Sequence, residues 1–370
     1  MPMFKHVCSI RLLQSLQHTV TSALQLYCKH YYNTSMSDHA LAHIGRRHYV
    51  SISGLSHVLK EIKAHFNEHG ILPESDSRQS IKRAREQDMS QYNHHKYGDL
   101  IQSFTMQMQK GPDREFLYVD PMTLMHALIE HKPIFRKLIA EQLMRHVPSP
   151  SKPLGIIYYG DEVTPGDSLQ KVNKRKIECI YWTFAELGPL CHTKEFLWFP
   201  LTVHRSMFCH NVVGGTTAWS AKNLEIFYKQ GSNFLVDAFQ HSSYIIFATV
   251  TNIVADENAL KEIYGVKGHG GLLCCGTCQN VVGKRTLLDA HRPSLVSVVC
   301  CDPTKFNVHT STTFRGAAKR LLMKSAVLNK GQFGQEEMAA GLNLVPNGVL
   351  LSSTLERFAF DPATSWMYDI

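Results

Sequence analysis

The sequence predicts an α/β protein in which a mixed sheet is flanked by helices. Residues 154–159, 174–188, 195–206 and 243–254 are rich in aliphatic and aromatic side chains, which is typical of buried strands. Residues 218–231 (AWSAKNLEIFYKQG) have the pattern of a helix. The predicted order is three strands in succession, then a helix, then a fourth strand.

Length and composition narrow the class of protein. The chain has 370 residues, of which 44% are hydrophobic, enough for two or three domains with sizeable cores. No apolar run approaches the roughly 20 residues of a membrane span, which argues against an integral membrane protein. The ten cysteines lack the density of a secreted disulfide scaffold and indicate a reducing compartment. A net charge of +8 favours an anionic partner such as nucleic acid.

Residues 1–37 form a poorly defined N-terminal segment. They contain no Asp or Glu but carry Lys5, Arg11 and Lys29, a composition that faintly resembles a mitochondrial transit peptide. Mitochondrial targeting is therefore a weak alternative to the nuclear location considered below.

Residues 38–100 are predicted to be helical and to bind DNA. The stretch SGLSHVLKEIKAHFNEHG has apolar positions on one helix face and ends at Gly70. A second helix follows, and its basic side chains are Arg78, Lys82, Arg83 and Arg85. A helix-turn-helix with a basic second helix suits contact with DNA phosphates. A solvated face on an ordinary helical hairpin explains the same residues, since base-reading side chains such as Asn are absent from that helix.

Two acidic residues follow predicted strands of the core domain, residues 151–265. A connecting region, residues 101–150, precedes this domain. Asp161 follows the first strand in LGIIYYGDEVTPG, and Asp256 follows the fourth. Because the ends of central strands project side chains into the crevice where sites form, we expect the two aspartates to meet there. Glu162 and Glu257 come next in sequence but point to the opposite face, so they are second choices.

Asp256 also has a purely structural interpretation. The segment ADENALKEIYG predicts a helix that Gly265 ends, and an aspartate before the first turn is a preferred N-cap. An N-cap serving only its helix therefore remains an alternative to a metal ligand. The metal interpretation rests on chemistry, because Mg²⁺ or Mn²⁺ prefers carboxylate oxygens and supports phosphodiester cleavage.

A Cys-x-x-Cys pair, Cys275 and Cys278, lies in residues 266–310. Two thiolates at this spacing suit one Zn²⁺, and the adjacent glycines permit a tight turn. Two further ligands are needed, and the candidates are His291, Cys300, Cys301 and His309. A redox pair is the alternative, although the cysteines do not open a helix as in a thioredoxin-type unit. Cys274 is interpreted as a bystander.

Several stretches carry a family resemblance. They are YYGDEVTPG, YWTFAELGP, FATVTNIVADENALKEIYGVKGHGGLLCCGTC and the closing SWMYDI. Across most of residues 40–370 the chain resembles a family of transposon-derived proteins, similar in turn to CACTA-type and Plavaka-type DDE transposases with a ribonuclease H-like fold. The resemblance implies a nuclear DNA-binding protein in which Asp161 and Asp256 hold Mg²⁺ or Mn²⁺ and the cysteine pair holds Zn²⁺. A homo-oligomer is compatible with it.

The resemblance also implies a third acid from a helix beyond the cysteines. Residues 311–370 are predicted to be a helical C-terminal part that is incomplete, so we expect this chain to be inactive alone. The available acids there are Glu336, Glu337, Glu356, Asp361 and Asp369. Two alternatives stay open: a catalytically inactive, zinc-stapled DNA-binding relative, and a scaffold with a redox cysteine pair that does not bind nucleic acid.

Overall fold

The computed structural model divides into two compact units, Met1–Lys96 and Tyr97–Ile370. It describes residues 93–164, 176–229, 234–237, 245–283 and 294–368, together with positions 56, 79, 82 and 83. In the first unit Lys82 and Arg83 are helical and exposed, and the unit's last strand is β1 (His94–His95). Arg78 and Arg85 of the predicted basic helix lie outside the described residues.

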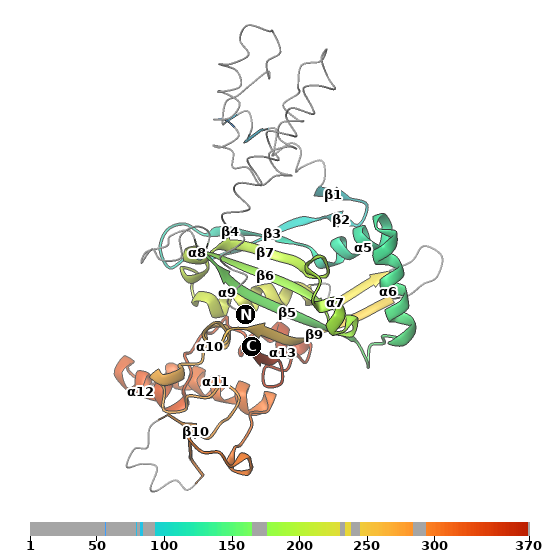
Figure 1. Ribbon diagram of the computed structural model, residues 1–370. Coiled ribbons are helices and arrows are strands. Elements are labelled where there is room, and N and C mark those ends of the chain that lie inside the picture. Colours follow the sequence, from blue (N-terminus) through green and yellow to red (C-terminus); the bar gives the residue numbers. More distant parts are fainter. Residues whose placement is uncertain are drawn as a thin grey trace, which may run out of the picture. The chain divides into compact units, whose positions relative to one another are not determined.

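A mixed sheet flanked by helices organises the second unit (Figure 1). The strand order is β12-β9-β5-β6-β7, and β8 also pairs with β9. β6 is antiparallel to both β5 and β7, whereas β9 is parallel to both β5 and β12. The strands are β5 (Leu154–Val163), β6 (Ile177–Phe184), β7 (Phe199–Arg205), β8 (Phe234–Asp237), β9 (Ile245–Ala255) and β12 (Trp366–Tyr368).

The predicted strands of the core are confirmed, with one difference at β5. This strand does not end before Asp161 but continues to Val163. The reason is the ladder with β6, which pairs Asp161 with Cys179 and Glu162 with Glu178. The acidic residues therefore sit within the antiparallel part of the sheet, beyond the last pair that β5 forms with β9.

The predicted helix between the third and fourth core strands is α9 (Gly215–Glu225), and the short η3 (Ile226–Tyr228) follows it. The ring of Trp182 on β6 lies 5.6 Å from that of Phe227 on η3 and 5.0 Å from that of Phe199 on β7, measured between centroids. These contacts fix the helical segment against one face of the sheet. The helix α8 (Ser206–His210) leads from β7 toward α9.

Residues 97–145 build a hairpin and two helices within the second unit. They form β2 (Gly98–Asp99), β3 (Ile101–Met106), β4 (Arg114–Val119), α5 (Pro121–His131) and α6 (Pro133–Arg145). Phe116, Met125 and Ile139 are buried and belong to the same apolar core as the sheet. Thr202 on β7 donates a hydrogen bond to the carbonyl of Leu117 at 2.6 Å, which ties the hairpin to the sheet.

The segment after β9 begins with α10 (Glu257–Tyr264), as predicted. Gly265 ends it in the left-handed region with φ of 72°, where a glycine is favoured. The remaining elements are η4 (Gly268–Gly270), β10 (Val281–Val282), β11 (Val296–Ser297), η6 (Pro303–Lys305), α11 (Ser311–Ser325), α12 (Lys330–Ala340) and α13 (Ser353–Arg357). Between β6 and β7 lie η1 (Ala185–Leu187), α7 (Pro189–His192) and η2 (Glu195–Leu197).

Across the described ranges, no helix has both the length and the apolar character needed to cross a membrane.

Candidate functional site

Asp161 and Asp256 line one cavity of about 130 Å³. The parallel ladder between β5 and β9 pairs Tyr159 with Val254. Asp161 comes two residues after Tyr159, and Asp256 comes two residues after Val254. The shared register carries both carboxylates to the same end of two neighbouring strands. The structure thus brings together two residues that lie far apart in the sequence.

Asp256 acts as the N-cap of α10. Its Oδ1 accepts a hydrogen bond from the backbone N–H of Ala259 at 2.6 Å. The structural role considered from the sequence is therefore present. It is compatible with metal binding, because an ionised carboxylate has two oxygens and the cap uses one of them.

Three further carboxylates line the same cavity: Glu162, Glu178 and Glu262. Glu162 was expected to point to the face opposite Asp161, which is wrong, since both line this cavity, and Glu178 and Glu262 were not predicted. Glu178 is placed by its pairing with Glu162 across the antiparallel ladder, and only the strand register reveals that pairing. Glu262 comes from α10, one and a half turns after Asp256. The signal for Glu262 was its position on that predicted helix.

A histidine bridges two of these carboxylates. The His210 Nε2 atom lies 3.9 Å from Glu178 Oε1 and 3.8 Å from Glu262 Oε2. His210 belongs to α8 and also lines the cavity. When it is protonated it offsets part of the negative charge of this pocket.

The two facing glutamates have opposite electrostatic environments. Partial burial favours the neutral form of Glu162, but the hydrogen bond from Lys176 and the nearby Ser206 outweigh it, so the pKa of Glu162 is lowered. Burial raises the pKa of Glu178, although the nearby Ser206 opposes this, and the charge of Glu162 raises it further. Glu178 therefore resists ionisation, while the charge of Glu162 is paired with Lys176.

The remaining acids named from the sequence lie elsewhere. Glu336 pairs with Lys324 at 2.6 Å, Glu337 with Lys267 at 3.4 Å, and Glu356 with Lys319 at 2.6 Å. Asp361 accepts a hydrogen bond from the backbone of Ala363, and Asp369 lies outside the described residues. None of the described ones lines the acidic cavity.

Glu257, the other second choice, pairs with Lys261 on the first turns of α10. It is exposed and is not among the residues that line the acidic cavity. Its side chain therefore supports the helix rather than the site.

The cysteine turn is packed against the edge of the sheet. A Cβ atom added to Gly276 would lie 2.2 Å from the Trp366 ring. Because the ring approaches the backbone so closely, only glycine fits at position 276. The Trp366 ring in turn stacks on Tyr264 with centroids 4.8 Å apart. Because Trp366 pairs with Ile253 of β9, the turn is connected to the strand that precedes Asp256.

Cys275 and Cys278 are both free thiols, and both lie close to the hydroxyl of Thr277. Thr277 Oγ1 lies 3.1 Å from Cys275 Sγ and 3.8 Å from Cys278 Sγ. Burial raises the pKa of the Cys278 thiol, and Cys275 contributes in the same direction. A raised pKa makes a thiol a poor nucleophile in the absence of a metal, which suits a structural role.

The proposed partners of the pair are distributed differently. His309 lies beside the turn, since its backbone N–H donates to the Thr277 carbonyl at 2.8 Å, and burial lowers the pKa of its imidazole to about 4. Cys300 and Cys301 make contacts within their own loop, and His291 lies outside the described residues. In the described part of the chain, no compact group of three ligand atoms includes both Cys275 and Cys278.

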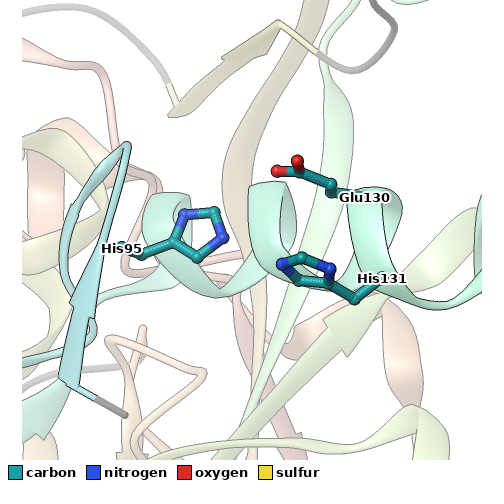
Figure 2. Close-up of side chains that lie close together, drawn as sticks. All are labelled: His95, Glu130 and His131. Carbon is teal, nitrogen blue, oxygen red and sulfur yellow. The ribbon is translucent and has the colours of Figure 1, made fainter. Parts of the chain in front are cut away.

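Figure 2 shows a different group of metal-binding residue types, His95, Glu130 and His131. His95 belongs to the first compact unit, and the other two end helix α5 of the second. Because these residues belong to different units, no site is assigned to them.

No protein-family profile matches this sequence, and no curated protein matches it either.

Proposed function

We propose that the chain is a DNA-binding, transposase-like protein derived from a CACTA-related element, with a ribonuclease H-like fold and a partial DDE-type site. The observation that carries the proposal is the position of Asp161 on the first core strand and of Asp256 just after the fourth, where both line one cavity. The strand order supports it as well, since the antiparallel strands β5, β6 and β7 are extended on the β5 side by the parallel strands β9 and then β12. The transposon origin rests on the sequence resemblance.

The donor set fits a hard divalent cation. Carboxylate oxygens are the ligands that Mg²⁺ and Mn²⁺ accept most readily, and the cavity offers oxygens from Asp161 and Asp256. When bound, such an ion would polarise a phosphodiester and lower the pKa of a coordinated water or hydroxyl. Glu162 is paired with Lys176, and Glu178 is held toward its neutral form. The aspartates are thus the principal ligands, and the site is incomplete for cleavage.

Binding of Mn²⁺ tests this function. We expect titration followed by electron paramagnetic resonance to detect weak binding to the intact chain and at least a tenfold loss in Asp161→Asn and Asp256→Ser. Serine is chosen because it keeps the N-cap of α10 and removes only the carboxylate. The matched control is Asp120→Ser, since Asp120 caps α5 with a 3.0 Å bond to Thr123 outside the acidic cavity. It should bind Mn²⁺ as the intact chain does.

The same preparations test catalysis. Labelled duplex DNA should remain uncut in the presence of Mg²⁺ or Mn²⁺. Equal Mn²⁺ binding by Asp161→Asn would refute the metal site. Metal-dependent cutting that Asp161→Ala abolishes would refute the inactivity of this chain and show that a present carboxylate, such as Glu178 or Glu262, completes the constellation.

Duplex contacts are assigned to the basic helix of the first unit. The exposed, helical Lys82 and Arg83 support this assignment. Changing them together with Arg78 and Arg85 to Ala should weaken duplex binding and flatten its salt dependence, because fewer counterions are released. An unchanged salt slope would place the contacts elsewhere.

The second candidate function is a catalytically inactive, zinc-stapled DNA-binding relative. The packing of Gly276 on Trp366 favours it, because the cysteine turn then stabilises the sheet edge whether or not the acidic cavity holds a metal. Retained zinc without any Mn²⁺ binding would select this candidate.

A further inference from the structure

A larger cavity of about 380 Å³ lies in the second unit, separate from the acidic cavity. Its walls come from β3, β4, the α9–η3 segment and the region around α13. Its volume is in the range of pockets that hold a small organic ligand. The side chains around it combine positive charge with aromatic rings.

Three cationic residues line this cavity: Lys222, Lys229 and Arg357. Lys222 forms an ion pair with Glu225 at 2.9 Å. The Lys229 ammonium instead has neutral partners, donating to the Tyr118 hydroxyl at 2.7 Å and to the Gln102 side-chain oxygen. The Arg357 guanidinium lies over the Phe358 ring, 5.6 Å from its centroid. Positive charge therefore exceeds negative charge at the cavity wall, and we call this the basic cavity.

Aromatic rings form two of the walls. Phe358 stacks on Tyr228 with centroids 5.3 Å apart and planes 8° from parallel. The rings of Phe104 and Tyr118 also line the cavity, with centroids 5.9 Å apart. Phe358 is only partly buried, which leaves part of its surface for a ligand.

The backbone beside Phe358 is strained. Ala359 has φ of 56° and is the one non-glycine residue with positive φ among the described residues. A left-handed conformation at alanine costs about 1 kcal/mol and persists where the surrounding structure enforces it. The turn directly follows Arg357 and Phe358, which line the cavity.

We propose that this cavity binds an unpaired nucleotide of single-stranded DNA, with the base against Phe358 and a phosphate at Arg357 and Lys229. A phosphate needs cations, and a base needs a flat apolar surface, so a nucleotide uses both kinds of residue. The paired base of an intact duplex cannot reach such a surface. The choice of DNA as the polymer rests on the proposed function.

The position of the cavity agrees with this ligand. Helix α9 lines the acidic cavity with Thr216, Trp219 and Ser220 and the basic cavity with Lys222 and Glu225. At 1.5 Å per residue the centres of these two sets of positions lie about 8 Å apart along the helix. The two cavities are therefore neighbours along one helix, within the span of a few nucleotides.

Fluorescence anisotropy with labelled strands of about 12 nucleotides tests the proposal. The probes are oligothymidylate and an abasic strand of equal length, measured in EDTA. Phe358→Leu should weaken thymidylate binding by about fivefold or more and leave abasic binding unchanged, because this variant removes only stacking. The pair Arg357→Gln and Lys229→Gln should lower the salt slope on both probes by about 0.7 for each phosphate that the variant no longer neutralises.

Matched controls are available in the same unit. Phe196 is 76% exposed and lies outside the cavity, so Phe196→Leu should bind both probes like the intact chain. Lys137→Gln, at an exposed position of α6, should leave the salt slope unchanged. Equal affinity of the intact chain for the two probes, or equal weakening on both in Phe358→Leu, would refute base binding. An unchanged slope in the cation variants would refute the phosphate site.

The outcome is separable from that of the proposed metal site. The strand measurements contain no metal and can be repeated in Asp161→Asn, which should bind thymidylate normally. Loss of Mn²⁺ binding with intact strand binding would remove only the metal proposal, and the reverse result would remove only this one.

Discussion

Asp161 lies on strand β5 and Asp256 directly follows strand β9, whereas Cys275 and Cys278 lie in a loop, and the two pairs illustrate different routes to a site. The aspartates come together because β5 and β9 are hydrogen-bonded neighbours with a fixed register. The cysteines lie three residues apart in sequence, but their further ligands must come from loops outside the six-stranded sheet. Sheet pairing transmits long-range proximity, and loop connections do not.

The cysteine turn is nevertheless firmly attached to the sheet. Gly276 packs against Trp366, and Trp366 pairs with β9 next to the strand end that carries Asp256. The cysteine turn and the aspartates are thus both held by the sheet, and they differ in how their metal-binding side chains are brought together. Tests that remove the metal and tests that remove the packing separate these two contributions.

Removal of both thiols should have the largest effect. If Cys275 and Cys278 hold zinc, the purified chain should contain about one zinc, and the double Ser variant should contain almost none and unfold at lower denaturant concentration. Elemental analysis and urea unfolding measure the two effects. A double Cys300→Ser and Cys301→Ser variant tests whether that loop supplies the remaining ligands. Stoichiometric zinc in the Cys275 and Cys278 variant would show that the metal lies elsewhere.

Gly276→Ala should have the next largest effect. The added methyl group would overlap the Trp366 ring, so we expect a loss of about 1 to 3 kcal/mol in the free energy of unfolding. Shortening the partner in Gly276→Ala with Trp366→Leu should make the two effects clearly non-additive, because the changes share one contact.

Gly334→Ala is the control for this contact. Gly334 lies within α12, and nothing approaches within 4 Å of an added Cβ there. This change should be neutral or stabilise by up to about 1 kcal/mol, since alanine is the better helix former. Equal effects of the two substitutions would mean that the turn is not packed on the sheet.

Different parts of the structure were predictable to different degrees. The strand 245–255 and helix 257–264 were accessible because β-branched runs and the Asp and Gly at the helix ends are local signals. The adjacency of the strands that lead to Asp161 and Asp256 was expected from the strand order, whereas the pairing of Asp161 with Cys179 was not. Glu178 was not accessible, because its place depends on the exact register of β6 against β5. The basic cavity combines residues from four distant segments, and no single stretch of sequence contains its pattern.

The smallest expected effect concerns Glu162 and Glu178, which face each other across the β5–β6 ladder. The raised pKa of Glu178 means that folding favours its protonated form, so its contribution to stability is lost as pH rises through that pKa. Glu178→Gln should therefore match the intact chain near pH 4 and be more stable near pH 7.

The lowered pKa of Glu162 has the opposite consequence, because folding favours its ionised form. The stability that Glu162 contributes is therefore lost as pH falls through that pKa. Glu162→Gln should be less stable near pH 7, and this difference should disappear near pH 3. Thermal unfolding in EDTA across this range measures both variants. Parallel pH profiles for the two would contradict the electrostatic assignment and would make either glutamate as available to a metal as the aspartates.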